Sequence, residues 1–303
     1  MERDGSTAVI VHWGDPAPTT EVALRYCAEG TFSKVAVVAN DLQECPAALQ
    51  GSAVSWLVPP RNLGFGGGCS LGARRHPAAK YAFLNADVIL KPGTVTSCLD
   101  ALDLPDVGIS APALYFPDGE LQSGCGFVSK YLKMARSNNL PAGSVNECDW
   151  VTGAALFCKH EVFESVGFDG SYFLGVEDVD IGYRAKLNGW KVVLLSSDIA
   201  VHPARTTLNG ARPVYYGIRN QIWFARRHGS LLGSLALTLC LLRGMPRVIL
   251  ADVVKRRSSH VHLLYRGLIA GWRALPNVRE PLLSEPIPSR WIDWEGNCRP
   301  HRQ

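Results

Sequence analysis

Carboxylates, an amide and a histidine follow apolar runs of this chain, where they could hold a metal ion or accept a proton. Asn85-Ala86-Asp87 and His202 each follow such a run, and Glu177-Asp178 opens an acidic segment. A carboxylate at a strand end can hold Mg²⁺ or Mn²⁺ and leave coordination positions for phosphate oxygens. The ion would then neutralise a leaving diphosphate. A second carboxylate, not bound to the metal, can take a proton from an attacking hydroxyl.

Each of these features also has a structural alternative. Asp87 could be a turn residue, because Asp is common after strands. Glu177-Asp178 could serve only to favour a helix N-terminus through the helix dipole. His202 could be a structural histidine with satisfied hydrogen bonds, and the glycines at 64 and 66–68 could simply mark a turn.

The first part of the chain alternates apolar, β-branched runs with helical segments. This alternation is typical of βαβ units and predicts a mostly parallel sheet. Ligands of such sheets bind at the carboxyl ends of the strands, so we expect the chemistry just after Trp13, Asn40, Pro59 and Leu84. Strands are predicted over residues 7–13, 32–40, 52–58 and 81–84, and helices over 16–29 and from the glycines toward Arg75.

The pattern becomes irregular from about residue 106. Beyond it, strands are predicted over 150–159, 191–195 and 199–201, and helices over 160–166 and 179–188. Asp180 and Arg184 are four residues apart on the second helix, a spacing that favours an ion pair over a catalytic role. After His202 the chain reads as helical and basic, and residues 276–303 read as a proline-rich surface loop.

Charge is distributed unevenly along the 303 residues, which are 47% hydrophobic and carry a formal charge of +4. Residues 1–204 have a balance of −7, and residues 205–303 one of +11. The first residues lack the order of a secretory signal. The nine cysteines show no CxxC spacing, which favours free thiols in a reducing compartment. The uncharged stretch 229–242 is too short to span a membrane, so we expect a cytoplasmic protein.

Several common catalytic motifs are absent from the sequence. The glycines at 64 and 66 do not complete the G-x-G-x-x-G/A fingerprint, because Cys69 and Leu71 occupy its last position. There is no Gly-Lys pair for a phosphate-binding loop, no HExxH and no G-x-S-x-G. The usual dehydrogenase, kinase, zincin and hydrolase interpretations therefore lose their anchors.

Taken together, the remaining motifs resemble the inverting glycosyltransferases of family 2, which have a GT-A fold. The similarity covers roughly residues 7–228 and is greatest to bacterial rhamnosyltransferases and galactofuranosyltransferases of the cell envelope. The ordered motifs that carry it are VIVHW, VVAN, RNLGFGGGCSLGA, FLNADVIL, WVTGAALF, GFDGSYFLGVEDVDIGYRAKLNGW, the His-Pro of 202–203 and YYGIRN.

The resemblance implies roles for the acidic groups. Asn85-Ala86-Asp87 matches the D-x-D element of the family with Asn in the first position, so Asp87 would hold the metal and Asn85 would reach the nucleotide or a metal-bound water. His202 would complete the metal site. Asp178 matches the catalytic base, and Glu177 would orient it or bind sugar hydroxyls. The implied cofactor is Mg²⁺ or Mn²⁺.

The resemblance also implies a donor pocket and an acceptor segment. The usual Asp-Asn pair after the second strand appears here as Ala39-Asn40-Asp41, which leaves the nucleotide open and makes Asp41 a candidate substitute. Gly153 and Ala154 would lie beneath the sugar and acceptor, with Trp150 either a stacking platform or a core aromatic. The full set of implied donor residues is Val11, His12, Trp13, Asn40, Asp41, Arg61, Asn62, Gly64, Phe65, Gly66, Asn85, Ala86 and Asp87.

We therefore predict a GT-A catalytic domain over 1–228, with a nucleotide-sugar half (1–105) and an acceptor half (106–228), followed by a helical extension over 229–303. The predicted reaction is metal-dependent, inverting transfer of a sugar, with rhamnose a candidate, from a nucleotide sugar to a hydroxyl of a glycan, lipid-linked or small-molecule acceptor. The alternatives are a nucleotidyltransferase that makes the nucleotide sugar, or a non-catalytic binding protein. The basic extension could contact the inner face of a membrane or form a homodimer, and no motif points to nucleic acid.

Overall fold

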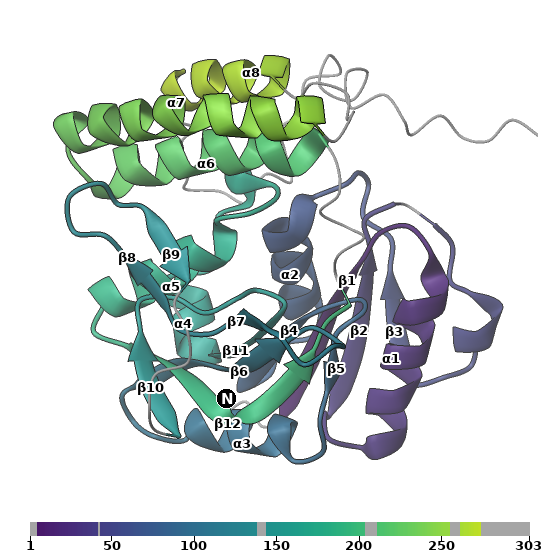
Figure 1. The fold of residues 1–303 in the computed structure, drawn as a ribbon. Coiled ribbons are helices and arrows are strands. Elements are labelled where there is room, and N and C mark those ends of the chain that lie inside the picture. Colours follow the sequence, from purple (N-terminus) through teal and green to yellow (C-terminus); the bar gives the residue numbers. More distant parts are fainter. Residues whose placement is uncertain (1–4, 42, 138–143, 204–210, 255–260, 274–303) are drawn as a thin grey trace, which may run out of the picture.

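The computed structural model describes residues 5–41, 43–137, 144–203, 211–254 and 261–273. A central sheet carries helices on both faces, and three further helices form a separate layer at one end (Figure 1). The predicted α/β class is therefore confirmed.

Four parallel strands make up the first half of the sheet, in the order β4-β1-β2-β3. Almost every residue of β1 and β2 is buried, as expected for parallel strands that helices cover on both sides. Each predicted strand is confirmed to within three residues at either end. The elements are β1 (Ser6–His12), α1 (Pro16–Glu29), β2 (Lys34–Ala39), η1 (Ala47–Leu49), β3 (Val54–Leu57), α2 (Gly64–Arg75) and β4 (Lys80–Asn85).

The second half of the sheet is mixed. It continues from β4 through β11 and β6 to β12 and β10, with β11 antiparallel to both of its neighbours and β6 parallel to β12. Its elements are β5 (Ile89–Leu90), α3 (Thr94–Ala101), β6 (Val107–Tyr115), β7 (Leu121–Ser123), β8 (Gly126–Val128), β9 (Ala135–Ser137), β10 (Val145–Cys148), β11 (Ala155–Lys159), α4 (His160–Ser165), η2 (Gly170–Tyr172), α5 (Glu177–Leu187) and β12 (Lys191–Val201).

Three sequence expectations for this half are wrong in detail. The strand expected over 150–159 begins only at Ala155, because the segment before it turns toward α5. The region that looked irregular from residue 106 contains β6, a nine-residue strand in the middle of the sheet. The strands expected over 191–195 and 199–201 form one strand, β12, whose pairing with β6 is irregular between Leu195 and Ile199.

Two apolar cores lie on opposite faces of the sheet. Ile10 and Leu84 point to the face that α1 and α3 cover. Val9 and Phe83, one position earlier in each strand, point to the face that α2, α4 and α5 cover. This alternation is the period-two pattern of a strand, and it fixes which side of the sheet each helix occupies.

The basic C-terminal part is helical, as predicted, and forms α6 (Ala211–His228), α7 (Leu231–Val254) and α8 (Val261–Trp272). α6 packs against both α7 and α8 and lies between them and the rest of the molecule (Figure 1). Within the described parts of the chain, none of the helices has the length and apolar character needed to cross a bilayer. The loop expected over 276–303 lies outside the described residues.

Candidate active site

Pairing between β5 and β12 brings the two predicted metal ligands together. Ile89 is opposite Val201 in this antiparallel pair, so Asp87 just before β5 meets His202 just after β12. Asp87 Oδ1 lies 3.0 Å from His202 Nε2, and the Asn85 amide nitrogen lies 3.1 Å from the same ring nitrogen. The sequence prediction that these three residues share one site agrees with this geometry.

Gln122 is a fourth member of this cluster that the sequence did not indicate. It lies on β7, and its amide group is 3.2 Å from His202 Nδ1. Contacts at both ring nitrogens hold the imidazole of a buried histidine in one orientation. No motif in the sequence indicates Gln122, because it is a single Gln in the region whose pattern is irregular.

Asp87 and His202 fit two neighbouring positions around a divalent ion. Adjacent ligands of an octahedral ion, each about 2.1 Å from the metal, lie about 3.0 Å apart, which matches the separation of these two atoms. Among the residues described here, no third His, Cys, Asp or Glu joins the pair. The other coordination positions would therefore fall to donor oxygens and water.

Antiparallel pairing of β11 with β4 places the predicted acceptor segment beside Asn85. The backbone N–H of Asn85 donates to the carbonyl of Ala154 at 3.0 Å. Gly153, one residue earlier, donates its N–H to Asp178 Oδ2 at 2.9 Å, and Val179 donates to Asp178 Oδ1 at 2.8 Å. The carboxylate on α5 is thereby tied to the same edge of the sheet as the candidate metal ligands.

The two adjacent acids differ in environment. Asp178 is half-buried. The loss of water around its carboxyl raises its pKa, although the N–H groups of Gly153 and Val179 favour its charged form. Glu177 is buried, and its Oε2 has no hydrogen-bond partner among the described residues.

Desolvation dominates the chemistry of Glu177. Burial raises its pKa, and the neighbouring charge of Asp178 raises it further, whereas the backbone amides of Glu177 and Gly175 and the charge of Arg219 act in the opposite direction. A carboxyl pair whose members both bind protons more tightly than usual can act as a stronger base than a free carboxylate.

Asn40 connects the end of β2 to residues 61–66, which span the loop before α2 and its first residues and are called the glycine-rich loop here. Its side-chain amide donates to the carbonyl of Gly64 at 2.8 Å, and its Oδ1 accepts from Leu63 N–H at 3.1 Å. Asn62 Oδ1 accepts from Gly64 N–H at 2.9 Å. Gly64 has φ +69°, and a Cβ there would lie 2.1 Å from the carbonyl oxygen of Phe173, so only glycine fits.

His12 and Asp41 are engaged with each other at the end of β1. His12 is fully buried; its Nδ1 lies 2.7 Å from Thr19 Oγ1 and its Nε2 lies 3.1 Å from Asp41 Oδ2. Burial lowers the pKa of His12, which favours a neutral ring. Asp41 also accepts from the backbone N–H groups of Gly14 and Gln43, so both of its oxygens have local partners.

The other predicted donor residues surround this loop in varied environments. Trp13 is 46% exposed just beyond β1, whereas the side chain of Val11 faces Gly68 of α2. Phe65 lies near Gly153, and Gly66 lies near Glu177, which joins the loop to the acidic pair. Arg61 and Ala86 are both partly buried.

Trp150 has a packing environment. A Cβ at Gly126 would lie 2.2 Å from its indole ring, and one at Gly182 of α5 would lie 2.8 Å from its Cα, so both glycines allow the tryptophan to approach closely. Its ring belongs to a cluster of apolar residues that includes Val176 and Tyr183. This supports the core-aromatic alternative, and acceptor stacking by Trp150 remains a prediction.

The fold that holds this site is that of the GT-A glycosyltransferases. The chain superposes with GalNAc-T7, solved with UDP, GalNAc and Mn²⁺, with a TM-score of 0.58 and 12% identity, over 74% of this chain and 48% of that one. It superposes with the mannosyltransferase PcManGT of Pyrobaculum calidifontis, solved with GDP-Man and Mn²⁺, with a TM-score of 0.54 and 14% identity, over 89% and 86%. At these identities the likeness establishes the fold, which confirms the GT-A prediction.

Sequence relatives point to the same class of protein. The chain is 27% identical over 186 residues to N-acetylglucosaminyl-diphospho-decaprenol L-rhamnosyltransferase of Mycobacterium tuberculosis, which covers 50% of this chain and 60% of that relative. It is 29% identical over 134 residues to O-antigen biosynthesis protein RfbC of Myxococcus xanthus, covering 40% and 10%. The match thus spans less than two thirds of each relative, and no protein-family model matches the chain.

Burial of the Glu177 carboxyl predicts a pH-dependent stability. The unfolded chain ionises this group near its ordinary pKa of 4.5, whereas the folded protein keeps the proton to higher pH. The free energy of unfolding therefore falls as pH rises from about 4.5 through the raised pKa. Glu177→Gln removes this cost, and we expect its melting temperature to exceed that of the wild type by about 2 to 5 °C above that range.

Thermal unfolding of both proteins from pH 4 to pH 9 measures this difference. Glu161→Gln, at an exposed position of α4, is the matched control and should follow the wild type. A Glu177→Gln variant with the same stability profile as the wild type would contradict a desolvated carboxyl at this position.

Proposed function

We propose that the protein is a metal-dependent, inverting glycosyltransferase that moves a sugar from a nucleoside diphosphate sugar to an acceptor hydroxyl. The observation that carries the proposal is that a candidate metal-binding pair and a candidate general base lie at the same edge of the sheet. Asp87 and His202 fit a divalent ion, and Asp178 is held beside them through Gly153, next to the Ala154 carbonyl that binds Asn85.

One displacement accounts for the whole reaction in this proposal. The acceptor hydroxyl attacks the anomeric carbon while its proton passes to the Asp178 carboxylate. The new bond joins the acceptor oxygen to that carbon, and the bond from the carbon to the diphosphate oxygen breaks, so the nucleoside diphosphate leaves with the electron pair. A single attack from the face opposite the leaving group inverts the anomeric configuration.

Asp87 and His202 would hold the ion at the diphosphate end of the donor. A bound divalent ion offsets the negative charge that develops on the leaving diphosphate. An imidazole ligand suits Mn²⁺ better than Mg²⁺, which prefers oxygen ligands only. The Mn²⁺ in the two solved GT-A structures supports the same choice.

The donor pocket in this proposal lies between β1, β2 and the glycine-rich loop. Asn40 holds the loop in place, and Asp41 and His12 brace the end of β1, so their contribution to donor binding is to shape the pocket. The exposed ring of Trp13 is left as the large contact surface for the nucleotide base. Rhamnose is the candidate sugar because the rhamnosyltransferase is among the relatives.

Two variants, one without the base and one without a metal ligand, should separate the loss of proton transfer from the loss of donor binding. Asp178→Asn should lower kcat by about 10² to 10⁴ with little change in donor affinity, because only proton transfer is lost. Asp87→Ala should weaken binding of the donor with Mn²⁺ as well as turnover. Nucleoside diphosphate release and calorimetric donor titration, across a panel of nucleotide sugars, measure both.

Asp106→Asn is the control for these variants, because its carboxyl is exposed at the opposite end of β6 and is paired with Lys191. It should leave both measurements unchanged. Full turnover by Asp178→Asn would remove Asp178 from the mechanism. Release of pyrophosphate from a sugar phosphate and a nucleoside triphosphate would instead identify a nucleotidyltransferase.

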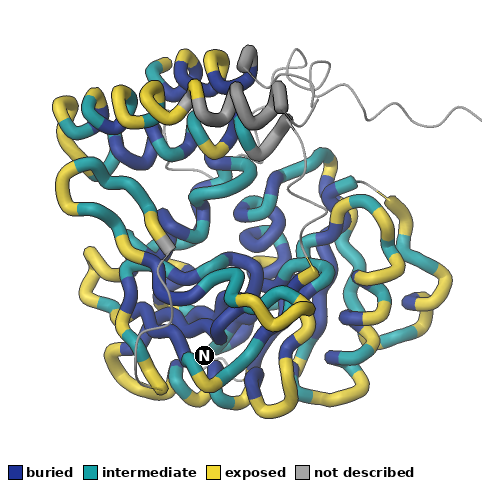
Figure 2. Tube along the Cα trace, in the orientation of Figure 1, coloured by how far each residue is buried: buried dark blue, intermediate teal, exposed yellow. Residues whose placement is uncertain are grey.

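The acceptor in this proposal is reached at an anionic membrane surface. Five leucines of α7 are 42% to 78% exposed and occupy about 100° of the helix circumference, opposite the buried residues Ser234 and Leu237. The described residues 211–254 and 261–273 contain eight Arg and a single acid, so the charge of this layer complements anionic lipid headgroups. Figure 2 shows exposed segments along the outer side of α7. The leucines are Leu231, Leu232, Leu235, Leu239 and Leu242.

We expect the protein to bind phosphatidylglycerol vesicles more tightly than phosphatidylcholine vesicles, and binding to weaken with salt. Combined Leu232→Gln, Leu235→Gln and Leu239→Gln changes should weaken binding by more than about tenfold, because each removes apolar burial. Leu187→Gln, at a position 63% exposed on α5, is the matched control. Vesicle flotation measures binding, and equal affinity for both lipids, or self-association through α7 without vesicle binding, would overturn this assignment.

A further inference from the structure

The turn that precedes α5 has an unusual backbone. Leu174 N–H donates to the carbonyl of Tyr172 at 2.8 Å, which closes a γ-turn around Phe173 at φ 64° and ψ −55°. This form of γ-turn is rare and strained. Val176, which caps α5, also has a left-handed backbone at φ 76°, a conformation that β-branched residues seldom adopt. Such a backbone persists only where its surroundings hold it.

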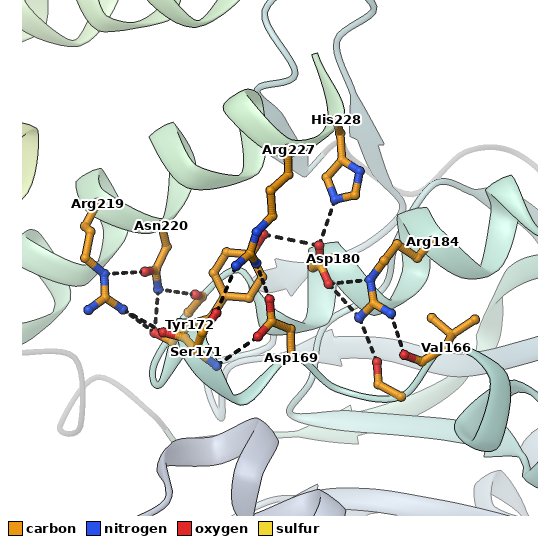
Figure 3. Close-up of polar contacts among 12 residues, drawn as sticks. Val166, Asp169, Ser171, Tyr172, Asp180, Arg184, Arg219, Asn220, Arg227 and His228 are labelled. Carbon is orange, nitrogen blue, oxygen red and sulfur yellow. Dashed lines mark hydrogen bonds and ion pairs between the residues drawn. The ribbon is translucent and has the colours of Figure 1, made fainter. Parts of the chain in front are cut away.

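Asn220 of α6 holds this turn. Its side chain is fully buried, and its amide nitrogen lies within hydrogen-bond distance of three backbone carbonyls of the turn, those of Tyr172 at 2.9 Å, Leu174 at 2.9 Å and Gly175 at 2.6 Å. Its Oδ1 accepts from Arg219 Nε at 2.8 Å, which fixes the orientation of the amide (Figure 3). Arg219 also donates to the carbonyl of Tyr172 at 2.7 Å.

The same turn connects the two sides of the candidate active site. The carbonyl of Phe173 accepts from the N–H of Phe65 at 2.9 Å. Phe65 is the second residue of α2 and belongs to the glycine-rich loop. The turn leads directly into α5, whose first two residues are Glu177 and Asp178. A shift of the turn would therefore move the acidic pair and the donor loop together.

α6 has separate contacts that secure it to α5. His228 lies 2.8 Å from Asp180 Oδ1, and Arg184 pairs with the other oxygen of Asp180 at 2.6 Å, as the sequence spacing predicted for Asp180 and Arg184 (Figure 3). Arg227 pairs with Asp169, just before η2. Because the contacts of His228 and Arg227 already dock α6, the three contacts of Asn220 are not needed for docking alone.

We propose that Asn220 is a positioning residue, which holds the strained turn over 172–176 so that Asp178 and Glu177 meet the acceptor hydroxyl in the reactive geometry. This role rests on the proposed glycosyltransferase function. The hydrogen bonds of the Asn220 side chain to described residues go to the backbone of the turn and to the side chain of Arg219.

Asn220→Ala, compared with Gln221→Ala, tests the proposal. Gln221 is the next residue of α6, and its amide donates to a backbone carbonyl, that of Lys133, away from the turn. Measured well below the melting temperature of each variant, Asn220→Ala should lower kcat by about tenfold to hundredfold, and Gln221→Ala should leave it within about twofold. Equal kcat values for the two variants would overturn the proposal.

The pH dependence of kcat separates positioning from a loss of folded protein. The amide of Gly175 and the charge of Arg219 lower the pKa of Glu177, whereas Asp178 raises it, and Cys69 also lies within the electrostatic reach of Glu177. A released turn changes the surroundings of both coupled carboxyls, so the acid limb of the profile, which reports ionisation of Asp178 beside Glu177, should shift in Asn220→Ala and stay in place in Gln221→Ala. A merely structural role would lower kcat equally at every pH, and an unmoved limb would count against positioning.

Relief of the strain should rescue the variant. Val176→Gly in the Asn220→Ala background removes the left-handed penalty at Val176 and should recover several-fold of the lost kcat. No recovery would contradict the role of Asn220 in holding a strained turn. If Asn220→Ala does not fold, Asn220→Ser, which keeps one donor, undergoes the same measurements.

Amide hydrogen exchange over 172–178 tests the turn without any activity. Faster exchange in Asn220→Ala than in Gln221→Ala supports the proposal, and equal exchange opposes it. A wild-type protein with no transfer activity refutes the proposed function, whereas an active wild type with unchanged exchange and kcat in Asn220→Ala refutes the positioning role alone.

Discussion

The turn before α5 is the constraint on which the site depends, because it contacts the donor loop and α6 and leads directly into the acidic pair. Its carbonyl at Phe173 meets Phe65, and this contact leaves no room for a side chain at Gly64. Its carbonyls at Leu174 and Gly175 face Asn220. The turn makes these contacts with a left-handed backbone at Phe173 and Val176, a conformation that residues other than glycine seldom adopt and that persists only where its surroundings hold it.

The order and register of the strands position the rest of the site, namely the donor residues and the candidate metal ligands. Parallel strands place their carboxyl ends along one edge, which positions the ends of β1, β2 and β4. The short antiparallel strand β5 then carries Asp87 to the far end of β12, where His202 follows. Antiparallel β11 adds Gly153 and Ala154 at the end of β4. Hydrogen-bond register therefore determines which side chains meet, and the side chains need little mutual attraction to do so.

Local sequence patterns were sufficient for the parts of the protein that local physics decides. Apolar runs located β1 to β4 and placed Asp87, His202 and Asp178 near element ends, whereas the roles predicted for these three residues came from the family resemblance. Non-local pairing was the obstacle elsewhere. β6 was missed because its nine residues mix small, apolar and proline positions, so nothing local marks it as the central strand. Gln122 meets His202, 80 residues away, and Asn220 meets carbonyls of the turn 45 to 48 residues away, and no periodicity or spacing reveals such contacts.

The acidic and basic parts of the chain correspond to the two tasks of the proposed function, which are catalysis and contact with a membrane. Acids concentrate in the sheet domain, where burial of Glu177 without a partner for Oε2 among the described residues opposes stability. Arg219 moderates that cost from α6, since its positive charge lowers the pKa of Glu177 while its guanidinium hydrogen-bonds the carbonyl of Tyr172. The same helix packs against α7, whose leucines face outward. One basic helix thus lies between the surface proposed to meet the acceptor and the carboxylates proposed to activate it.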